Sequence, residues 1–137
     1  LIGFSDACTK AYGAVVYIKI VKNGDVSVEI LTAKTRVAPL KGMTLPKLEL
    51  SAAALLAKLM AKVKMAINIP IAKTTYYSDS QVTLAWIKAQ PTKWKLFVAN
   101  RVAEIQKLSN KDDWKYVSTK ENSADCASRG LLSINKS

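Results

Sequence analysis

The stretch AYGAVVYIKIVKNGDVSVEILTA, residues 11–33, decides the fold that this sequence predicts. Val, Ile and Tyr fill its first half, and Asn23-Gly24 is a strong signal for a two-residue hairpin turn. Residues 26–33 then alternate apolar and polar side chains, as a strand with one buried face does. The short apolar run 1–6 precedes this hairpin, so the N-terminal quarter of the chain predicts a three-stranded antiparallel meander.

Helical and strand-like segments alternate along the rest of the chain. Residues 34–45 are predicted to form a basic connecting loop. Thr44 offers an N-cap and Pro46 an early helical position for a long helix, 46–67, whose Ala, Leu and Met side chains predict burial against a sheet. The elements predicted after it are a strand 74–78, helices 80–89 and 97–108, a strand 114–118 and a short helix 122–131. This order predicts an α/β domain with a mixed sheet covered by helices.

The composition indicates one domain with a polyanionic partner. A chain of 137 residues suits a single core, and half of its residues are hydrophobic. Lys plus Arg is 21 and Asp plus Glu is 10, so the net charge is 21 − 10 = +11. Nucleic acid is a better partner than an anionic membrane, because the basic residues are scattered and no apolar run approaches the roughly 18 residues of a span.

The residue types restrict any bound metal to hard cations. The chain has no His and only two Cys, Cys8 and Cys126, which nearly excludes an ordinary zinc site. Oxygen ligands favour Mg²⁺, Mn²⁺ or Ca²⁺. Each Cys is close in sequence to a candidate ligand described next, and we interpret both as small buried thiols rather than as a disulfide.

Four of the ten acidic residues lie beside apolar residues at predicted element boundaries. Asp6 is expected to end the first strand and Asp79 the fourth, while Glu49 and Asp125 are expected in the first turns of the long helix and the last helix. A buried carboxylate is costly unless it is paired or binds a metal. The other acids are interpreted as solvated surface charges: Asp25, Glu29, Glu104, Asp112, Asp113 and Glu121.

Two interpretations of these four acids compete. Glu49 and Asp125 would serve the helix dipole, and Asp79 would cap the following helix, if each acted alone. Taken together, four acids at one sheet edge of a basic protein call for a cation. Four oxygen ligands suit two Mg²⁺ ions about 4 Å apart, where one ion activates a water and the other stabilises the leaving oxygen of a phosphoryl transfer.

Four segments resemble, in order and spacing, the four motifs of ribonuclease H. They are FSDAC at 4–8, LPKLEL at 45–50, YSDS at 77–80 and NSADCASRG at 122–130. The narrower likeness is to the ribonuclease H domain of the Pao/BEL group of LTR retrotransposons, and the segments 34–41 and 94–102 strengthen it. The resemblance covers nearly the whole chain.

The resemblance implies a ribonuclease H-like fold, a five-stranded mixed sheet with strands 1–3 antiparallel and helices flanking it. It implies endonucleolytic cleavage of the RNA strand of RNA–DNA hybrids by two Mg²⁺ ions, with Mn²⁺ as a substitute. Carried over by motif, Asp6, Glu49, Asp79 and Asp125 are both the catalytic residues and the metal ligands.

The same likeness makes residues 1–137 a single domain of a longer polyprotein that also carries reverse transcriptase, which fits the missing initiator Met. Such a domain is expected inside the cell, in cytoplasmic retroelement particles, and not to be secreted or bound to a membrane. The isolated domain is expected to be monomeric.

Candidate substrate contacts follow the third motif. Gln81 is similar to a hybrid-contacting Gln of retroviral relatives, although an exposed helix residue is an equal interpretation. A basic and aromatic patch flanks Pro91, where some relatives carry a substrate-binding protrusion. Its members are Lys88, Lys93, Trp94 and Lys95. We interpret the lysines as phosphate contacts and Trp94 rather as a core residue. Further phosphate-contact candidates are Lys34, Arg36, Lys41 and Arg129.

One departure from the family pattern concerns the loop 118–122, which lacks the His that many ribonucleases H carry there. This departure bears on turnover rate rather than on reaction type. Two alternatives stay open beside an active enzyme: a catalytically inactive, domesticated module that binds hybrids or duplexes, and another nuclease of the same superfold. Acids intact at all four positions favour the active enzyme, since buried charges cost stability.

Overall fold

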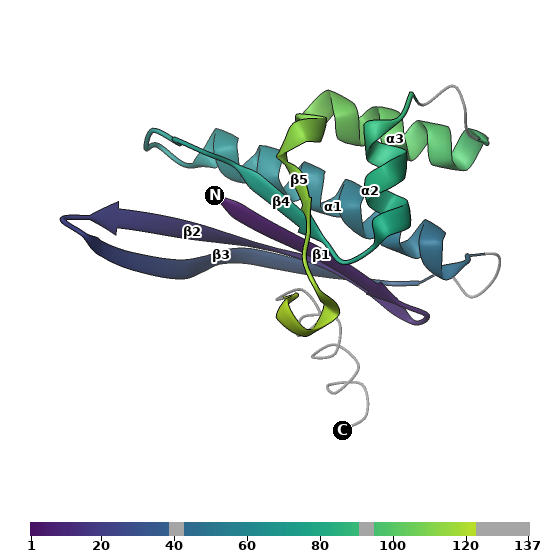
Figure 1. Ribbon diagram of the computed structural model, residues 1–137, viewed down its shortest axis with the longest axis horizontal. Helices are drawn as coiled ribbons and strands as arrows, with labels where there is room; N and C mark the ends of the chain where they lie inside the picture. The colour runs from purple at the N-terminus through teal and green to yellow at the C-terminus, as the bar shows by residue number, and fades with distance from the viewer. Residues whose placement is uncertain (39–42, 91–94, 123–137) are drawn as a thin grey trace.

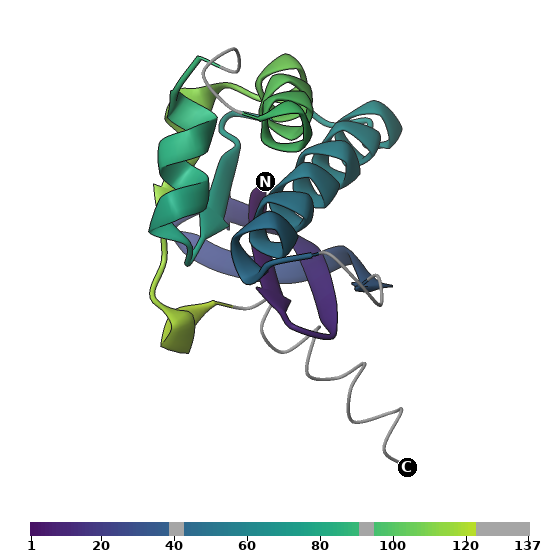
Figure 2. The ribbon, with the colours of Figure 1, turned by 90° about the vertical axis from the view of Figure 1, so that its right-hand side faces the viewer.

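The computed structural model describes residues 1–38, 43–90 and 95–122, and within them five strands form one mixed sheet with three helices on one of its faces (Figures 1 and 2). The strands are β1 (Ile2–Cys8), β2 (Ala11–Lys22), β3 (Asp25–Val37), β4 (Thr75–Ser78) and β5 (Trp114–Tyr116), in the spatial order β3-β2-β1-β4-β5. The helices are α1 (Leu45–Ala66), α2 (Gln81–Lys88) and α3 (Leu96–Leu108), with short 3₁₀ turns at Lys111–Asp113 and Thr119–Glu121. The predicted helix 122–131 falls outside the described residues apart from Asn122, which directly follows the second 3₁₀ turn as its C-cap.

The predicted antiparallel meander is confirmed. β1 pairs with β2 and β2 pairs with β3, both antiparallel. Asn23 and Gly24 form the turn between β2 and β3 with φ of 52° and 84°. The left-handed conformation at both positions is what a two-residue hairpin turn requires.

Three strand boundaries were predicted wrongly: β5 ends at Tyr116 rather than at residue 118, and the ends of β3 and β1 also differ. Residues 34–37 are strand rather than connecting loop, because they pair with residues 11–14 of β2. β1 does not end at Asp6 but continues to Cys8, which pairs with Ala11. For β3 and β1, a partner strand extends the ladder past the point where the apolar pattern stops.

The long helix is confirmed one residue earlier than predicted. Thr44 is its N-cap, and the Thr44 hydroxyl accepts a hydrogen bond from the Lys47 amide at 3.4 Å. α1 packs across β1 and β2, as its apolar composition predicted. None of the described helices is both long enough and apolar enough to cross a membrane.

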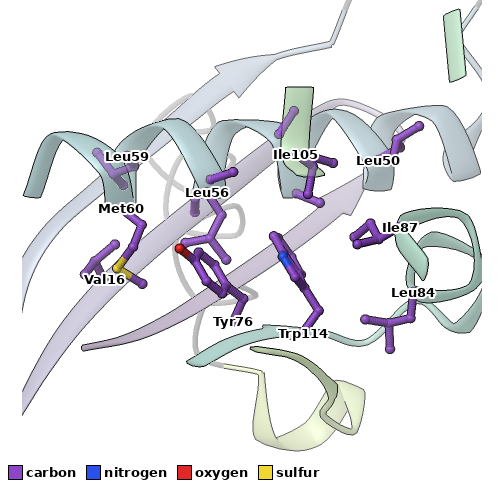
Figure 3. Packing of buried hydrophobic residues seen from close by; sticks show 14 of the residues in the cluster. Val16, Leu50, Leu56, Leu59, Met60, Tyr76, Leu84, Ile87, Ile105 and Trp114 are labelled. Carbon is purple, nitrogen blue, oxygen red and sulfur yellow. The ribbon is translucent and has the colours of Figure 1, made fainter. Parts of the chain in front are cut away.

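Buried side chains of α1 pack toward Tyr76, one of two stacked aromatic rings in the core. Figure 3 shows Leu56 and Met60 reaching from α1 toward Tyr76 of β4 and Val16 of β2. Tyr76 stacks on Trp114 of β5 with ring centroids 4.7 Å apart. These contacts set the distance between α1 and the sheet, and they join β2 to β4 and β5 in one core.

Gly3 of β1 lies directly beneath α1. A Cβ at Gly3 would lie 2.6 Å from Leu56 Cδ1 and 2.9 Å from Met60 Cε, and both of those side chains are fully buried. The absence of a side chain at Gly3 therefore sets how closely α1 approaches β1.

Gly3→Val is expected to lower the free energy of unfolding by about 1–3 kcal/mol, because the added methyl groups overpack this contact. Urea denaturation followed by circular dichroism measures it. The double variant Gly3→Val/Leu56→Ala should lose less than the sum of its single variants, since removing the Leu56 side chain opens the space. Strict additivity of the two changes would contradict this account of the packing.

Candidate metal centre

Two of the four predicted ligands lie on neighbouring strands at matching positions. β1 and β4 run parallel with Ser5 opposite Ser78, so Asp6 and Asp79 are the next residues of the two strands. Parallel neighbours in a sheet are about 4.8 Å apart. The pairing of β1 with β4 ends at Ser5–Ser78, and Asp6 itself is buried. The repeated Ser-Asp sequence thus marks one end of the β1–β4 pair.

α1 brings the third predicted ligand to the same end of the sheet. Glu49 precedes Leu56 by seven residues, which places both on one face of the helix and about 10 Å apart along its axis. Leu56 lies over Gly3, and α1 and β1 run in opposite directions (Figure 1). Three residues further along β1, about 10 Å, is Asp6. Glu49 and Asp6 therefore lie at the same end of the sheet, although Asp6 faces the side of β1 opposite to the one on which Gly3 meets α1.

The environment of Glu49 raises the pKa of its carboxyl group above the ordinary value. Burial is the largest cause, and the neighbouring Asp79 carboxylate also raises it. A hydrogen bond from the Ser80 side chain acts in the opposite direction and favours the ionised form. Glu49 and Asp79 are thus close enough to repel each other in a partly desolvated site.

The structure excludes the helix-end roles that were considered for Glu49 and Asp79. Glu49 was expected in the first turn of α1, but the helix begins at Leu45 and no acidic residue lies in its first turn. Service to the helix dipole therefore does not explain Glu49. Asp79 is not the N-cap of α2, because Ser80 holds that position and its hydroxyl accepts a hydrogen bond from the Thr83 amide at 3.1 Å. Neither acid therefore has a helix-capping task, and the Asp79 carboxylate lies close enough to raise the pKa of Glu49.

The fourth predicted ligand, Asp125, lies outside the described residues, but the chain leading to it is anchored at the same place. Asn122 is buried, and its side-chain amide donates a hydrogen bond to the Ser5 carbonyl at 2.9 Å. Ser5 directly precedes Asp6 in β1. The chain therefore enters the fourth motif beside the first.

The donors that the described residues provide fit a hard divalent cation. Glu49 and Asp79 offer only oxygen atoms, and their mutual repulsion is the kind that a bound cation reverses. In residues 1–38, 43–90 and 95–122, no group of three or more His, Cys, Asp or Glu side chains is arranged to hold a metal ion. A complete centre thus needs a contribution beyond this pair.

The predicted substrate residues are spread over α2 and its surroundings. Gln81 is the exposed first residue of α2, two positions after Asp79. Lys88 is exposed at the other end of α2, and Lys95 is exposed as the N-cap residue of α3. Three further candidates lie outside the described residues: Lys93, Trp94 and Arg129.

Sequence reasoning assigned no role to Ser80 or to Asn122. Ser80 both caps α2 and hydrogen-bonds Glu49, and Asn122 ties the fourth motif to β1. Both residues lie within the ribonuclease H-like motifs. Ser is a common N-cap residue, so the capping role of Ser80 could have been predicted from the sequence. The partner of Asn122, 117 residues away along the chain, has no local signal.

Comparison with known families decides the relationship. The family model of the Pao retrotransposon-like RNaseH-like domain matches residues 1–80, more than half of the chain. The chain belongs to this family. The matched region contains three of the predicted ligands, Asp6, Glu49 and Asp79, and ends before the segment that contains Asp125.

Solved structures show that this family member has the ribonuclease H fold. The N-terminal RNase H domain of a Mycobacterium tuberculosis protein, solved as a fusion with maltose-binding protein, superposes with a TM-score of 0.58 at 13% identity, covering 95% of this chain and 96% of that one. RNase H1 of Halobacterium salinarum superposes with a TM-score of 0.53 at 16% identity, covering 90% and 87%. A comparison with curated proteins gave no match.

Glu49→Gln is expected to stabilise the metal-free protein at neutral pH. The raised pKa means that the folded state binds the Glu49 proton more tightly than the unfolded state does, so stability is lost as pH rises through the folded pKa. The Gln variant has no proton to lose. Its melting temperature relative to wild type, measured in EDTA from pH 4 to 8, should therefore start near zero difference and grow with pH.

Glu29→Gln is the matched control, because Glu29 is exposed on β3 and loses the same charge. It should show no comparable gain. A difference between Glu49→Gln and wild type that stays flat across this pH range would contradict the assignment.

Proposed function

We propose that this domain is a ribonuclease H that cleaves the RNA strand of RNA–DNA hybrids with two divalent ions, Mg²⁺ or its substitute Mn²⁺. The observation that carries the proposal is the Glu49–Asp79 pair, held in a partly desolvated site at the end of β4, where neither acid serves a helix end. Membership of the RNaseH-like family supports the same chemistry. Asp6, Glu49, Asp79 and Asp125 would hold the ions.

Bound ions of this kind activate a water and neutralise charge on the scissile phosphate. The protein contributes to catalysis by holding its carboxylates in place before the ions bind. Ser80 hydrogen-bonds Glu49 and favours its ionised, ligating form, while α1 holds Glu49 at the same end of the sheet as Asp6. The chain has no His, so no imidazole assists proton transfer.

Binding of the hybrid would rest mainly on phosphate contacts. The net charge of +11 supports a polyanionic substrate. Gln81 lies two residues after Asp79, and its amide would read a 2′-hydroxyl near the cleavage site. Lys88 and Lys95 would contact phosphates further along, together with Lys93 and Arg129 of the segments outside the described residues.

The family name also supports a setting for the reaction. We propose that residues 1–137 act as one domain of a retrotransposon polyprotein, beside its reverse transcriptase and within cytoplasmic particles. Removal of RNA from the hybrid is the step that frees the new DNA strand for further copying.

Asp79→Asn is expected to reduce hybrid cleavage by at least about 100-fold, because loss of a metal ligand removes several kcal/mol of transition-state stabilisation. The fold should stay intact or gain stability, since the change relieves repulsion with Glu49. Cleavage of labelled RNA–DNA hybrid, duplex RNA and duplex DNA in Mg²⁺, Mn²⁺ or EDTA measures this.

Asp112→Asn is the control, because Asp112 is exposed on a 3₁₀ turn and should retain full activity. Metal-dependent loss of only the hybrid's RNA supports the proposal. Hybrid binding without cleavage by wild type at any metal concentration would instead identify an inactive binding module.

The double variant Lys88→Gln/Lys95→Gln is expected to weaken hybrid binding and to reduce the salt dependence of log K by about 1 to 2 in slope, if each lysine neutralises one phosphate. Fluorescence anisotropy at several salt concentrations measures it. The matched control Lys19→Gln/Lys22→Gln, toward the hairpin end of β2, should leave affinity and slope nearly unchanged. An equal loss in both variants would show that only net charge matters.

A further inference from the structure

The long outer strand of the sheet is open along one side. β3 spans 13 residues and, within the described part of the chain, pairs only with β2. The opposite edge strand, β5, has only three residues. Proteins usually shorten or cover such edges, because unpaired backbone groups on a long edge recruit another strand. An edge of this length is therefore a candidate interface.

Exposed aliphatic side chains line this edge. Val26, Val28 and Ile30 are 57%, 54% and 59% exposed, and they alternate along one face of β3. Val21, which pairs with Val26 across the hairpin, is 66% exposed. Figure 1 shows this end of the hairpin extending past the helices. A row of exposed aliphatic side chains beside an open strand edge is typical of a docking site rather than of a solvated strand.

A bulge places all the charges of β3 on the other face. Val16 pairs with Thr32 and Tyr17 with Ile30, so Leu31 is an extra residue that resets the alternation. As a result, the acidic pair Asp25 and Glu29 lies on the same face as the basic pair Lys34 and Arg36. The register confirms that the four charges share one face. Their partners on β2 are separated by even numbers of residues and so also share one face: Lys22, Ile18, Ala14 and Tyr12.

The four charges are divided along the strand. The acidic pair occupies the half of β3 near the hairpin turn, and the basic pair occupies the half that leads toward α1. None of the four forms an ion pair with another described residue. An antiparallel copy of β3 would lay its basic half on this acidic half and its acidic half on this basic half.

We propose that two copies of this domain associate through their β3 strands, antiparallel and related by a two-fold axis. The self-complementary charges favour a second copy over an unrelated strand, since one patch must match itself in a two-fold interface. The unpaired backbone groups of the two β3 edges would hydrogen-bond to each other, and the two sheets would join into one. This pairing replaces the monomer expected from the sequence, and it does not depend on the catalytic proposal.

Charge exchange tests the pairing. Lys34→Glu/Arg36→Glu makes β3 wholly acidic, and Asp25→Lys/Glu29→Lys makes it wholly basic. Wild type should dimerise in sedimentation velocity experiments, and each variant alone should dimerise at least about tenfold more weakly, because like charges then face each other. An equimolar mixture of the two variants should recover the dimer as a heterodimer.

Lys107→Glu/Lys115→Glu is the control matched to Lys34→Glu/Arg36→Glu, with the same change in net charge at exposed sites on α3 and β5. It should dimerise as wild type does, and circular dichroism checks that every variant is folded. Wild type that stays monomeric up to about 1 mM would overturn the proposal. Variants that keep the dimer, or a mixture that fails to restore it, would overturn it equally.

Discussion

The close contact between α1 and β1 at Gly3 is the constraint on which the rest of the structure depends. Because Gly3 has no side chain, Leu56 and Met60 settle against the strand and bring α1 to a fixed height above the sheet. The helix is rigid, so this contact also fixes the position of Glu49, two turns earlier. The same packing contact at Gly3 therefore positions both the core and the candidate metal centre.

The candidate centre concentrates negative charge in a strongly basic protein. Glu49 and Asp79 are held together although burial and mutual repulsion raise the pKa of Glu49. Such an arrangement costs folding stability, and among the described residues the Ser80 side chain offsets part of that cost by hydrogen-bonding Glu49. Strain of this kind at one end of a sheet, with no structural task for either acid, is characteristic of functional sites.

The bulge at Leu31 separates charged and exposed aliphatic side chains onto opposite faces of β3. Without the extra residue, strict alternation would put the acidic and basic pairs of β3 on opposite faces. With it, one face of the edge carries all four charges and the other carries the exposed aliphatic residues. The surface that we propose for self-association is therefore a product of register, which lies beyond the amino-acid pattern of either strand.

The sequence by itself determined the meander, the long helix with its Thr44 cap, the family motifs and the oxygen-only donor set, because turn chemistry, periodicity and composition are local properties. It misplaced the ends of β1 and β3, since those ends depend on partner strands. Only the tertiary structure decided that Glu49 lies beside Asp79, that Ser80 rather than Asp79 caps α2, and that Asn122 reaches Ser5. These features depend on contacts between different elements, or on which of two adjacent residues takes the N-cap position. Packing and strand register decide both, and local sequence preference does not.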